Sequence, residues 1–461
     1  MPKWKIGTIL IGSVVAYQII LAILYGGFPF YSSYPDEAWI ISAGVYLVKN
    51  IPLSEYQFSL AADKPILHPL FIGIEYALLG FPLFLYAMWI WNALTMSILI
   101  VSAYYVGKYF FDEKTGLLMA LLVGLNWHVA WYGQRVLNDV GMTAFVLLSV
   151  SLFGHFIQYK KKTSLLTSGF AAALAFWTKE PAIYLLTPFF GLALLEYRAA
   201  IKQTPYLILG FIAGFSPFAY VSAIRYGNPL FPFIAKTQMW EHVLFEFKFN
   251  FFVVEWLPFV LGLLVCIFLL VGLLVMLKKR KLLFFAWTVY SLMFYIFAFA
   301  PIERDKLLVH IDFILLLTAG VGLAWFTEIC MKKFGGLGVL PVAITLLSTN
   351  LYGSPFFYSL SQRKFVIPIF IHQRLNWDKY SAISQLIQDV KNKQSDWWFA
   401  QLFYESAGPN LTLIIITVAI FAVFVAAYLM LTRTRYVEKD IKRRKVERPH
   451  LFFRFKETSH S

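Results

Sequence analysis

Residues 254–300 read VEWLPFVLGLLVCIFLLVGLLVMLKKRKLLFFAWTVYSLMFYIFAFA, and this stretch decides the fold class. Two apolar runs, 254–277 and 282–300, flank the basic cluster Lys278–Lys281. Each run has about the 20 residues that an α-helix needs to cross a hydrocarbon core roughly 30 Å thick. Apolar runs joined by a short basic loop are typical of membrane-spanning helices connected on the cytoplasmic side.

The same alternation continues along all 461 residues, of which 59% are hydrophobic and only 14% charged. A soluble domain has about 25% charged residues, so a soluble fold is excluded. The net charge of +15 lies in short clusters between the apolar runs. No basic face with interleaved aromatic residues is left to bind nucleic acid. Cys266 and Cys330 both lie in apolar stretches, which excludes a disulfide framework and a zinc site.

We therefore predict an all-α polytopic membrane protein with about twelve transmembrane helices. The first, a basic and then apolar segment, is expected to be retained because no small-residue cleavage site follows it. The predicted spans lie near 6–27, 84–108, 117–133, 140–159, 164–178, 181–197, 204–223, 254–277, 282–300, 307–327, 335–352 and 411–431.

Residues 64–80 are apolar enough to span, but they contain charged residues and two prolines. If this segment lies in the membrane interface and the N-terminus is cytoplasmic, the basic clusters between spans and the basic C-terminal tail all face the cytoplasm. If it spans, these clusters move outside. The excess of Lys and Arg in cytoplasmic loops therefore predicts an interfacial segment.

This topology predicts four parts. Residues 1–352 form the transmembrane module, whose first outer loop is 28–83. Residues 353–410 form a small outer segment that reads strand, helix, strand, with the helix in WDKYSAISQLIQDVKNK, 377–393. The last span, 411–431, precedes a basic cytoplasmic tail over 432–461.

Ionisable residues at membrane depth or at span ends are costly and therefore suggest function. On this topology they gather at the outer face. They form five stretches: Asp36-Glu37, Asp63-Lys64, Arg135 with Asp139, Lys179-Glu180, and Glu303 to Lys306, which contains Arg304.

Each stretch also has a structural explanation. Asp36 and Glu37 follow Pro35, so they either complement the dipole of a helix over 36–48 or supply a general base. Lys64 either snorkels to the interface or holds a lipid phosphate. Arg135 and Asp139 have the spacing of an ion pair on one helical face.

The last two stretches can likewise be explained by structure or by function. Lys179-Glu180-Pro181 interrupts an apolar run, and irregular backbone at that depth usually lines a cavity. The charges from Glu303 to Lys306 are consistent with a solvated loop.

Four motifs in this order resemble the polyprenyl-phosphate-sugar-dependent glycosyltransferases of the C-type fold. They are YPDEAW (34–39), DKPILHPLFIGIEYALLG (63–80), QRVLNDVGMTAFVLLS (134–149) and AAALAFWTKEPAIYLLTP (171–188). The nearest likenesses are the protein O-mannosyltransferases and the lipid A aminoarabinose transferases. The resemblance covers the first 200 residues. The commoner Pro-Pro after the first lysine is Pro65-Ile66 here, and the large C-terminal soluble domain of some members is absent, which leaves the acceptor open.

The resemblance implies a role for each of the residues that match these motifs. The acidic pair Asp36 and Glu37 includes the catalytic base, and Asp139 is a second acidic site. Lys64 and Lys179 bind the donor phosphate, and we add Arg135 and Arg304 as further phosphate-binding cations. A divalent metal bridging Asp63 and the phosphate is allowed, but no ligand cluster in the sequence requires one.

The implied reaction is sugar transfer from a polyprenyl-phosphate carrier to a glycan, lipid or protein acceptor at the outer face of the cell membrane. A polyprenyl phosphate is already a good leaving group, so one carboxylate suffices to deprotonate the acceptor for inverting in-line attack. Cations stabilise the phosphate that departs. The sugar is mannose or a related hexose or pentose.

The sequence leaves two other functions open. Many spans and intramembrane charges also suit a transporter or a flippase for lipid-linked sugars, although the charges gather at one face rather than at mid-bilayer. An oligosaccharyltransferase shares the acidic outer loop. However, Trp397-Trp398 is followed by Phe-Ala-Gln rather than the Asp-Tyr-Gly expected of that group.

Overall fold

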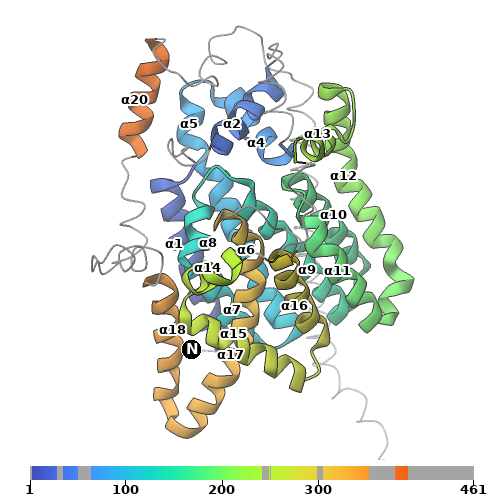
Figure 1. Ribbon diagram of the computed structural model, residues 1–461, viewed down its shortest axis with the longest axis vertical. Helices are drawn as coiled ribbons and strands as arrows, with labels where there is room; N and C mark the ends of the chain where they lie inside the picture. The colour runs from blue at the N-terminus through green and yellow to red at the C-terminus, as the bar shows by residue number, and fades with distance from the viewer. Residues whose placement is uncertain are drawn as a thin grey trace, which may run out of the picture. The chain divides into compact units, whose positions relative to one another are not determined.

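The computed structural model describes residues 3–27, 35–49, 64–240, 249, 251–297, 305–351 and 379–392. The chain divides into two compact units, 1–414 and 415–461, and every described residue belongs to the first. All elements described in that unit are helices (Figure 1).

In chain order, the described helices begin with α1 (Lys3–Tyr25), α2 (Pro35–Val48), α4 (Leu67–Leu79), α5 (Leu83–Ala87), α6 (Trp89–Phe110), α7 (Glu113–Leu125), α8 (Trp127–Gly133), α9 (Asn138–Tyr159), α10 (Lys162–Thr178) and α11 (Ala182–Glu196). They continue with η1 (Arg198–Gln203), α12 (Thr204–Tyr226), α13 (Phe231–Trp240), α14 (Phe251–Leu261), α15 (Leu263–Lys278), α16 (Leu282–Phe297), η2 (Asp305–Leu308), α17 (Val309–Phe334), η3 (Gly335–Val339) and α18 (Leu340–Leu351). Most of these helices follow the apolar runs of the sequence, and two of the breaks in them redirect the chain.

The two breaks divide predicted spans, and each has a local cause. The run 254–277 separates into α14 and α15 at Gly262, whose φ of 93° is readily available only to glycine. The run 117–133 bends by 59° between α7 and α8. Asn126 sits at this bend, and its side chain accepts hydrogen bonds from the backbone N–H groups of His128 and Val129 in the first turn of α8, which caps the new helix.

Five helical stretches among the described residues are long and apolar enough to cross a membrane, and the bent pair α7 and α8 would make a sixth. The five are Gly7–Tyr25, Leu83–Phe110, Asn138–Tyr159, Ala200–Tyr226 and Val309–Thr349. The helices α4, α11, α15 and α16 are apolar but shorter. The polytopic helical class is thus confirmed. The number of twelve spans stays a prediction, and the run 411–431 lies outside the described residues.

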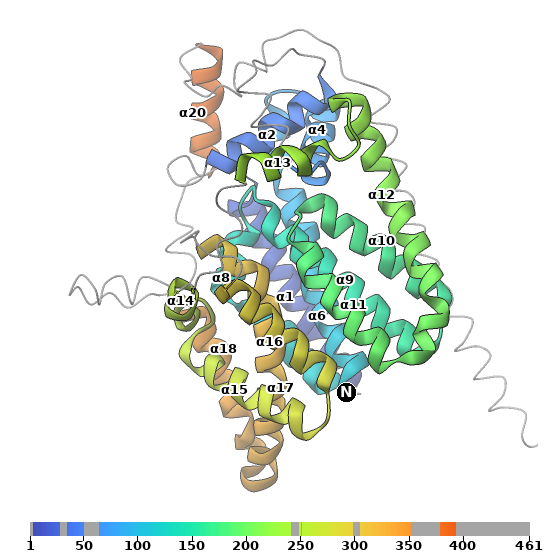
Figure 2. The same ribbon diagram turned by 45° about the vertical axis from the view of Figure 1, so that its right-hand side comes forward.

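Helix α4 corresponds to the segment that the charge pattern assigns to the interface. Its 13 residues reach about 20 Å at 1.5 Å per residue, which is shorter than the hydrocarbon core. It packs along α2, and both views place this pair at one end of the helix bundle (Figures 1 and 2). A Cβ atom at Gly44 of α2 would lie 2.5 Å from the carbonyl oxygen of Pro69 in α4, so the two main chains touch directly.

The basic loops meet at the opposite end. The ammonium of Lys281, before α16, lies 5.7 Å from the ring centroid of Phe111, after α6. Near the end of α17, Lys332 pairs with Glu328 at 2.9 Å, and the charges of Lys279 and Lys114 also act on that carboxylate. Helices α6, α9, α10 and α17 each have a basic residue at or next to this end. The other ends of α9, α10 and α17 carry residues of the candidate site.

Of the segment 353–410, the structure describes α20 (Lys379–Lys391), which lies where helical periodicity predicts it. The side chain of Lys379 donates hydrogen bonds to the carbonyl oxygens of Ile23 and Gly26, at the end of α1. The strands predicted on either side lie outside the described residues, and the division into four parts stays a prediction.

Candidate active site

The first ion pair of the candidate site joins Asp36 and Lys64. Asp36 lies in the first turn of α2, and Lys64 stands just before α4. The packing of α2 against α4 brings the Lys64 Nζ to 3.3 Å from Asp36 Oδ1. Lys64 also lies over the ring of Trp39 at 5.0 Å. Both charged side chains keep partial exposure, 18% for Asp36 and 11% for Lys64.

The second pair joins Glu37 and Arg135 and is fully enclosed. The Arg135 Nε donates a hydrogen bond of 2.7 Å to Glu37 Oε1, and at most 2% of either side chain is exposed. The guanidinium also lies over the ring of Trp131. The two acids that follow Pro35 thus have different environments. Asp36 is reachable from outside, whereas Glu37 is fixed inside by a buried cation.

The third pair joins Asp139 and Lys179. Asp139 lies in the first turn of α9, where a negative charge complements the helix dipole. Lys179 directly follows α10, and its Nζ lies 2.5 Å from Asp139 Oδ1. The same oxygen lies 2.6 Å from Nε2 of His310, in the first turn of α17. Asp139 is buried, and the Lys179 side chain is 14% exposed.

These contacts overturn the helical pair expected for Arg135 and Asp139. That alternative required one continuous helix through both residues, but α9 begins only at Asn138. The chain turns between α8 and α9, so Arg135 reaches α2 and Asp139 reaches the end of α10. Two other residues predicted for the site, Asp63 and Arg304, lie outside the described residues.

Several buried histidines and their partners belong to the same region, and the sequence analysis missed them. His128 of α8 lies 2.6 Å from Asp312 of α17, with both side chains fully buried. His68 of α4 contacts Asn138 at 2.7 Å, and burial lowers the pKa of His68 to about 3, so its ring is neutral. His310 and Asp312 stand in VHIDF, at the start of an apolar run, where the rule for ionisable residues at membrane depth would have found them.

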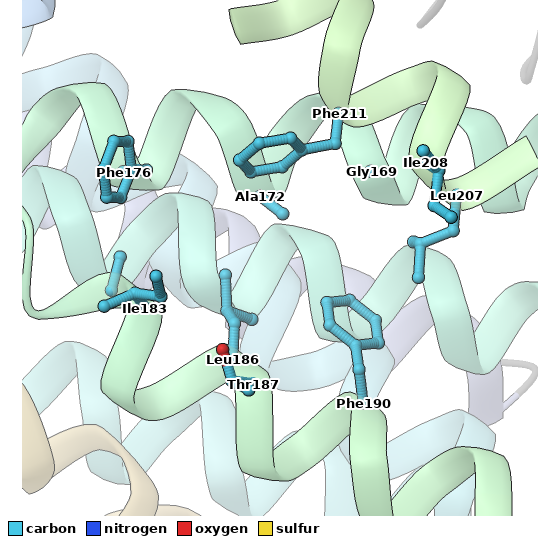
Figure 3. Close-up of a pocket in the computed structure, with 11 residues that line it drawn as sticks. Gly169, Ala172, Phe176, Ile183, Leu186, Thr187, Phe190, Leu207, Ile208 and Phe211 are labelled. Carbon is cyan, nitrogen blue, oxygen red and sulfur yellow. The ribbon is translucent and has the colours of Figure 1, made fainter. Parts of the chain in front are cut away.

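An apolar cavity of about 350 Å³ lies between α10, α11 and α12 (Figure 3). Phe176, Ile183, Leu186, Phe190 and Phe211 are among the side chains that face it. Phe176 precedes the break at 179–181 and Ile183 follows it. The irregular backbone at Lys179-Glu180-Pro181 therefore adjoins a cavity, as the sequence predicts.

The arrangement combines the partly exposed carboxylate of Asp36, the partly exposed side chains of Lys64 and Lys179, and an apolar cavity, which are parts that transfer from a lipid phosphate requires. The acids of the other two ion pairs, Glu37 and Asp139, are buried and paired with cations. No group of three or more His, Cys, Asp and Glu residues able to hold a metal ion occurs among the residues that the structure describes.

Comparisons with known proteins agree with this picture. Residues 63–221 match the family model described as dolichyl-phosphate-mannose-protein mannosyltransferase. No curated protein matches the sequence. The structure is similar to that of ArnT from Cupriavidus metallidurans bound to undecaprenyl phosphate, with a TM-score of 0.53 and 14% identity over 90% of this chain and 76% of that one.

A second similar structure is the archaeal oligosaccharyltransferase AglB from Archaeoglobus fulgidus, in complex with an inhibitory peptide and a dolichol-phosphate. Its TM-score is 0.50 at 10% identity, over 85% of this chain and 59% of that one. At such low identity these likenesses establish the fold alone.

The fold is therefore that of the C-type membrane glycosyltransferases, and the resemblance found in the sequence is confirmed. More particularly, residues 63–221 carry the sequence pattern of the mannosyltransferase family, and the match supports a glycosyltransferase that uses a polyprenyl-phosphate-linked sugar.

Proposed function

We propose that this protein transfers a mannose-like sugar from a polyprenyl-phosphate carrier to an acceptor at the outer face of the cell membrane. In the reaction, the acceptor oxygen attacks the anomeric carbon while the bond from that carbon to the phosphate oxygen breaks. The acceptor proton passes to a carboxylate, and the polyprenyl phosphate leaves. The anomeric configuration inverts because attack and departure are in line.

One observation supports Asp36 as the base above the other two acids: its side chain is 18% exposed, whereas those of Glu37 and Asp139 are at most 2% exposed. A general base must come within hydrogen-bond distance of the acceptor hydroxyl. Glu37 and Asp139 are themselves buried, Glu37 against Arg135 and Asp139 against His310 and Lys179, so they support the site rather than meet the acceptor.

Lys64 and Lys179 are the cations proposed for the leaving phosphate. Both lysine side chains are partly exposed, and the ammonium group of each lies beside a carboxylate. Arg135 is more enclosed, and its contact with Glu37 favours a role in holding that acid. Arg304 is the third proposed cation, and the proposal rests on the sequence alone.

The cavity beside Lys179 suits the carrier's hydrocarbon tail. Its walls are almost wholly apolar. Of the residues that line it, Phe176 precedes Lys179, the proposed phosphate ligand, by three residues, and Ile183 follows it by four. A lipid-linked donor needs this combination, because its phosphate and its tail bind at once.

The outer-face assignment rests on the separation of the two ends of the bundle. The basic loops, including Lys160 to Lys162, lie at the end away from the three ion pairs, and Lys-rich loops favour the cytoplasm. A cysteine at position 161 should therefore resist a membrane-impermeant thiol reagent in intact cells and react after lysis. Ready labelling in intact cells would place the site on the cytoplasmic face.

The deciding experiment uses the full chain purified into lipid nanodiscs. It is incubated with polyprenyl-phosphate donors that carry mannose, glucose or a pentose, together with a membrane extract as the acceptor source. Release of polyprenyl phosphate from the mannose donor, and its loss in Asp36→Asn, is the expected result. A protein that consumes no donor but moves lipid-linked sugar across proteoliposome membranes would instead be a flippase.

A further inference from the structure

Helix α17 brings a fully buried histidine to the candidate site. His310 is 0% exposed and contacts two other helices. Its Nε2 lies 2.6 Å from Asp139 Oδ1 in α9, and its Nδ1 lies 2.8 Å from the Tyr295 hydroxyl in α16. A buried polar cluster joining three helices is costly unless every member is paired.

The partners define which ring nitrogen carries the proton. Lys179 already pairs with Asp139, so that carboxylate is balanced without a charge on His310. In the neutral ring, Nε2–H donates to the carboxylate and Nδ1 accepts from the Tyr295 hydroxyl. The other neutral tautomer would set an unprotonated Nε2 against the carboxylate oxygen at 2.6 Å, with two acceptors facing each other.

Asp139 Oδ1 therefore accepts two hydrogen bonds, one from His310 and one from Lys179. The backbone of Lys179 is extended, with φ −163° and ψ 135°, and α11 does not begin until Ala182. No helix fixes the direction of its side chain. The carboxylate of Asp139 provides this constraint, and His310 in turn holds the carboxylate.

We propose that His310 is a positioning residue, which holds Asp139 so that the Lys179 ammonium is aimed at the phosphate of the lipid carrier. Tyr295 fixes the tautomer that this role requires. The inference rests on the proposed function, because it takes Lys179 as a phosphate ligand. It also assigns a task to α17, which lies beyond the residues that match the mannosyltransferase model.

The test measures phosphate recognition by the full-length protein in nanodiscs, without turnover. The probes are a polyprenyl phosphate and the corresponding polyprenol, and the readout is the ratio of their dissociation constants. His310→Leu should lower the preference for the phosphate about tenfold, the size expected for a hydrogen bond to a charged group. His310→Gln, which can keep an N–H near the position of Nε2, should retain most of the preference.

A double-mutant cycle shows whether His310 acts through Lys179. Lys179→Gln should also lower the phosphate preference, and adding His310→Leu to it should cause little further loss. Thr318→Val is the matched control. It removes a buried 2.8 Å contact between Thr318 and Thr288 in the same two helices, away from Asp139, and should leave the ratio unchanged.

Tyr295→Phe provides a milder variant if His310→Leu does not fold. It removes one hydroxyl and should lower the preference about threefold. A folded His310→Leu protein with wild-type preference, or additive losses in the double mutant, would overturn the inference and leave the proposed function intact. If the wild-type protein binds polyprenol as tightly as polyprenyl phosphate, the proposed function itself fails, and the inference fails with it.

Discussion

Asp36 and Glu37 are neighbours in sequence, yet the structure gives them different environments. Asp36 faces a partly exposed lysine at 3.3 Å, and Glu37 faces a buried arginine at 2.7 Å. Successive residues in a helix point about 100° apart, so one acid faces outward and the other faces the bundle. The comparison teaches that two adjacent acids can differ in exposure and partner; on the proposed function, Asp36 serves the chemistry and Glu37 holds the helix that carries it.

The largest effect is expected from substitution of Asp36, the partly exposed acid. Asp36→Asn keeps the shape of the side chain and removes the base, so it should lower sugar transfer by roughly 10²- to 10⁴-fold while sparing donor binding. Transfer rates and donor affinity measured on the same preparation provide the check. If Asp36 only complemented the dipole at the start of α2, Asp36→Asn would cost a little stability, and turnover would stay near normal.

Substitution of Glu37, the buried acid, should affect the stability of the fold more than the rate of sugar transfer. Glu37→Gln leaves Arg135 buried without its compensating charge, so stability should fall by about 3–5 kcal/mol in SDS-induced unfolding from mixed micelles. Replacing both partners by apolar residues, Glu37→Leu with Arg135→Met, should recover much of that loss. If Glu37→Gln were as stable as the wild-type protein, the Glu37–Arg135 pair would not hold α2 in place.

Substitutions of Lys64 test whether the Asp36–Lys64 pair binds the phosphate of the donor. Lys64→Ala should weaken binding of a polyprenyl-phosphate sugar by roughly tenfold, because a charged hydrogen-bond donor is lost. Lys64→Arg keeps the positive charge and should bind more tightly than Lys64→Ala. Equal binding by the wild-type protein and both variants would return Lys64 to the role of a snorkelling residue.

The smallest effect is expected at the other end of the bundle. Glu328 and Lys332 form an ion pair in α17 with both side chains largely exposed. Water and salt screen such pairs, so Glu328→Gln should leave both stability and transfer unchanged within error. A clear loss of transfer would mean that the basic end contributes to the reaction.

Much of the helical fold could be predicted from apolar runs because membrane helices must satisfy their backbone hydrogen bonds internally. The breaks at Asn126 and Gly262 could not, because apolar residues flank both positions and hydropathy averages over them. Capping by one amide and a positive φ at one glycine are local backbone choices.

The charged residues of the site were recognisable from the sequence, but not their pairing. Asp139 and Arg135 are four residues apart, whereas the partners in the structure, Lys179 and Glu37, are far away in the chain. Helix packing decides such contacts. The role of His310 could not be recognised for a different reason. It lies at the edge of a strongly apolar run, and the mean hydropathy of that run hides a single polar residue.

The direct contact between α2 and α4 has a consequence for finding related enzymes. The separation of Asp36 and Lys64 depends on how closely two main chains approach, and that approach depends on Gly44 and Gly73, neither of which has a side chain. A search guided only by charged motifs would ignore both positions. A distant relative that keeps the acid and the lysine but has bulky residues at these two places should have a wider site, and it should not be assigned the same substrate.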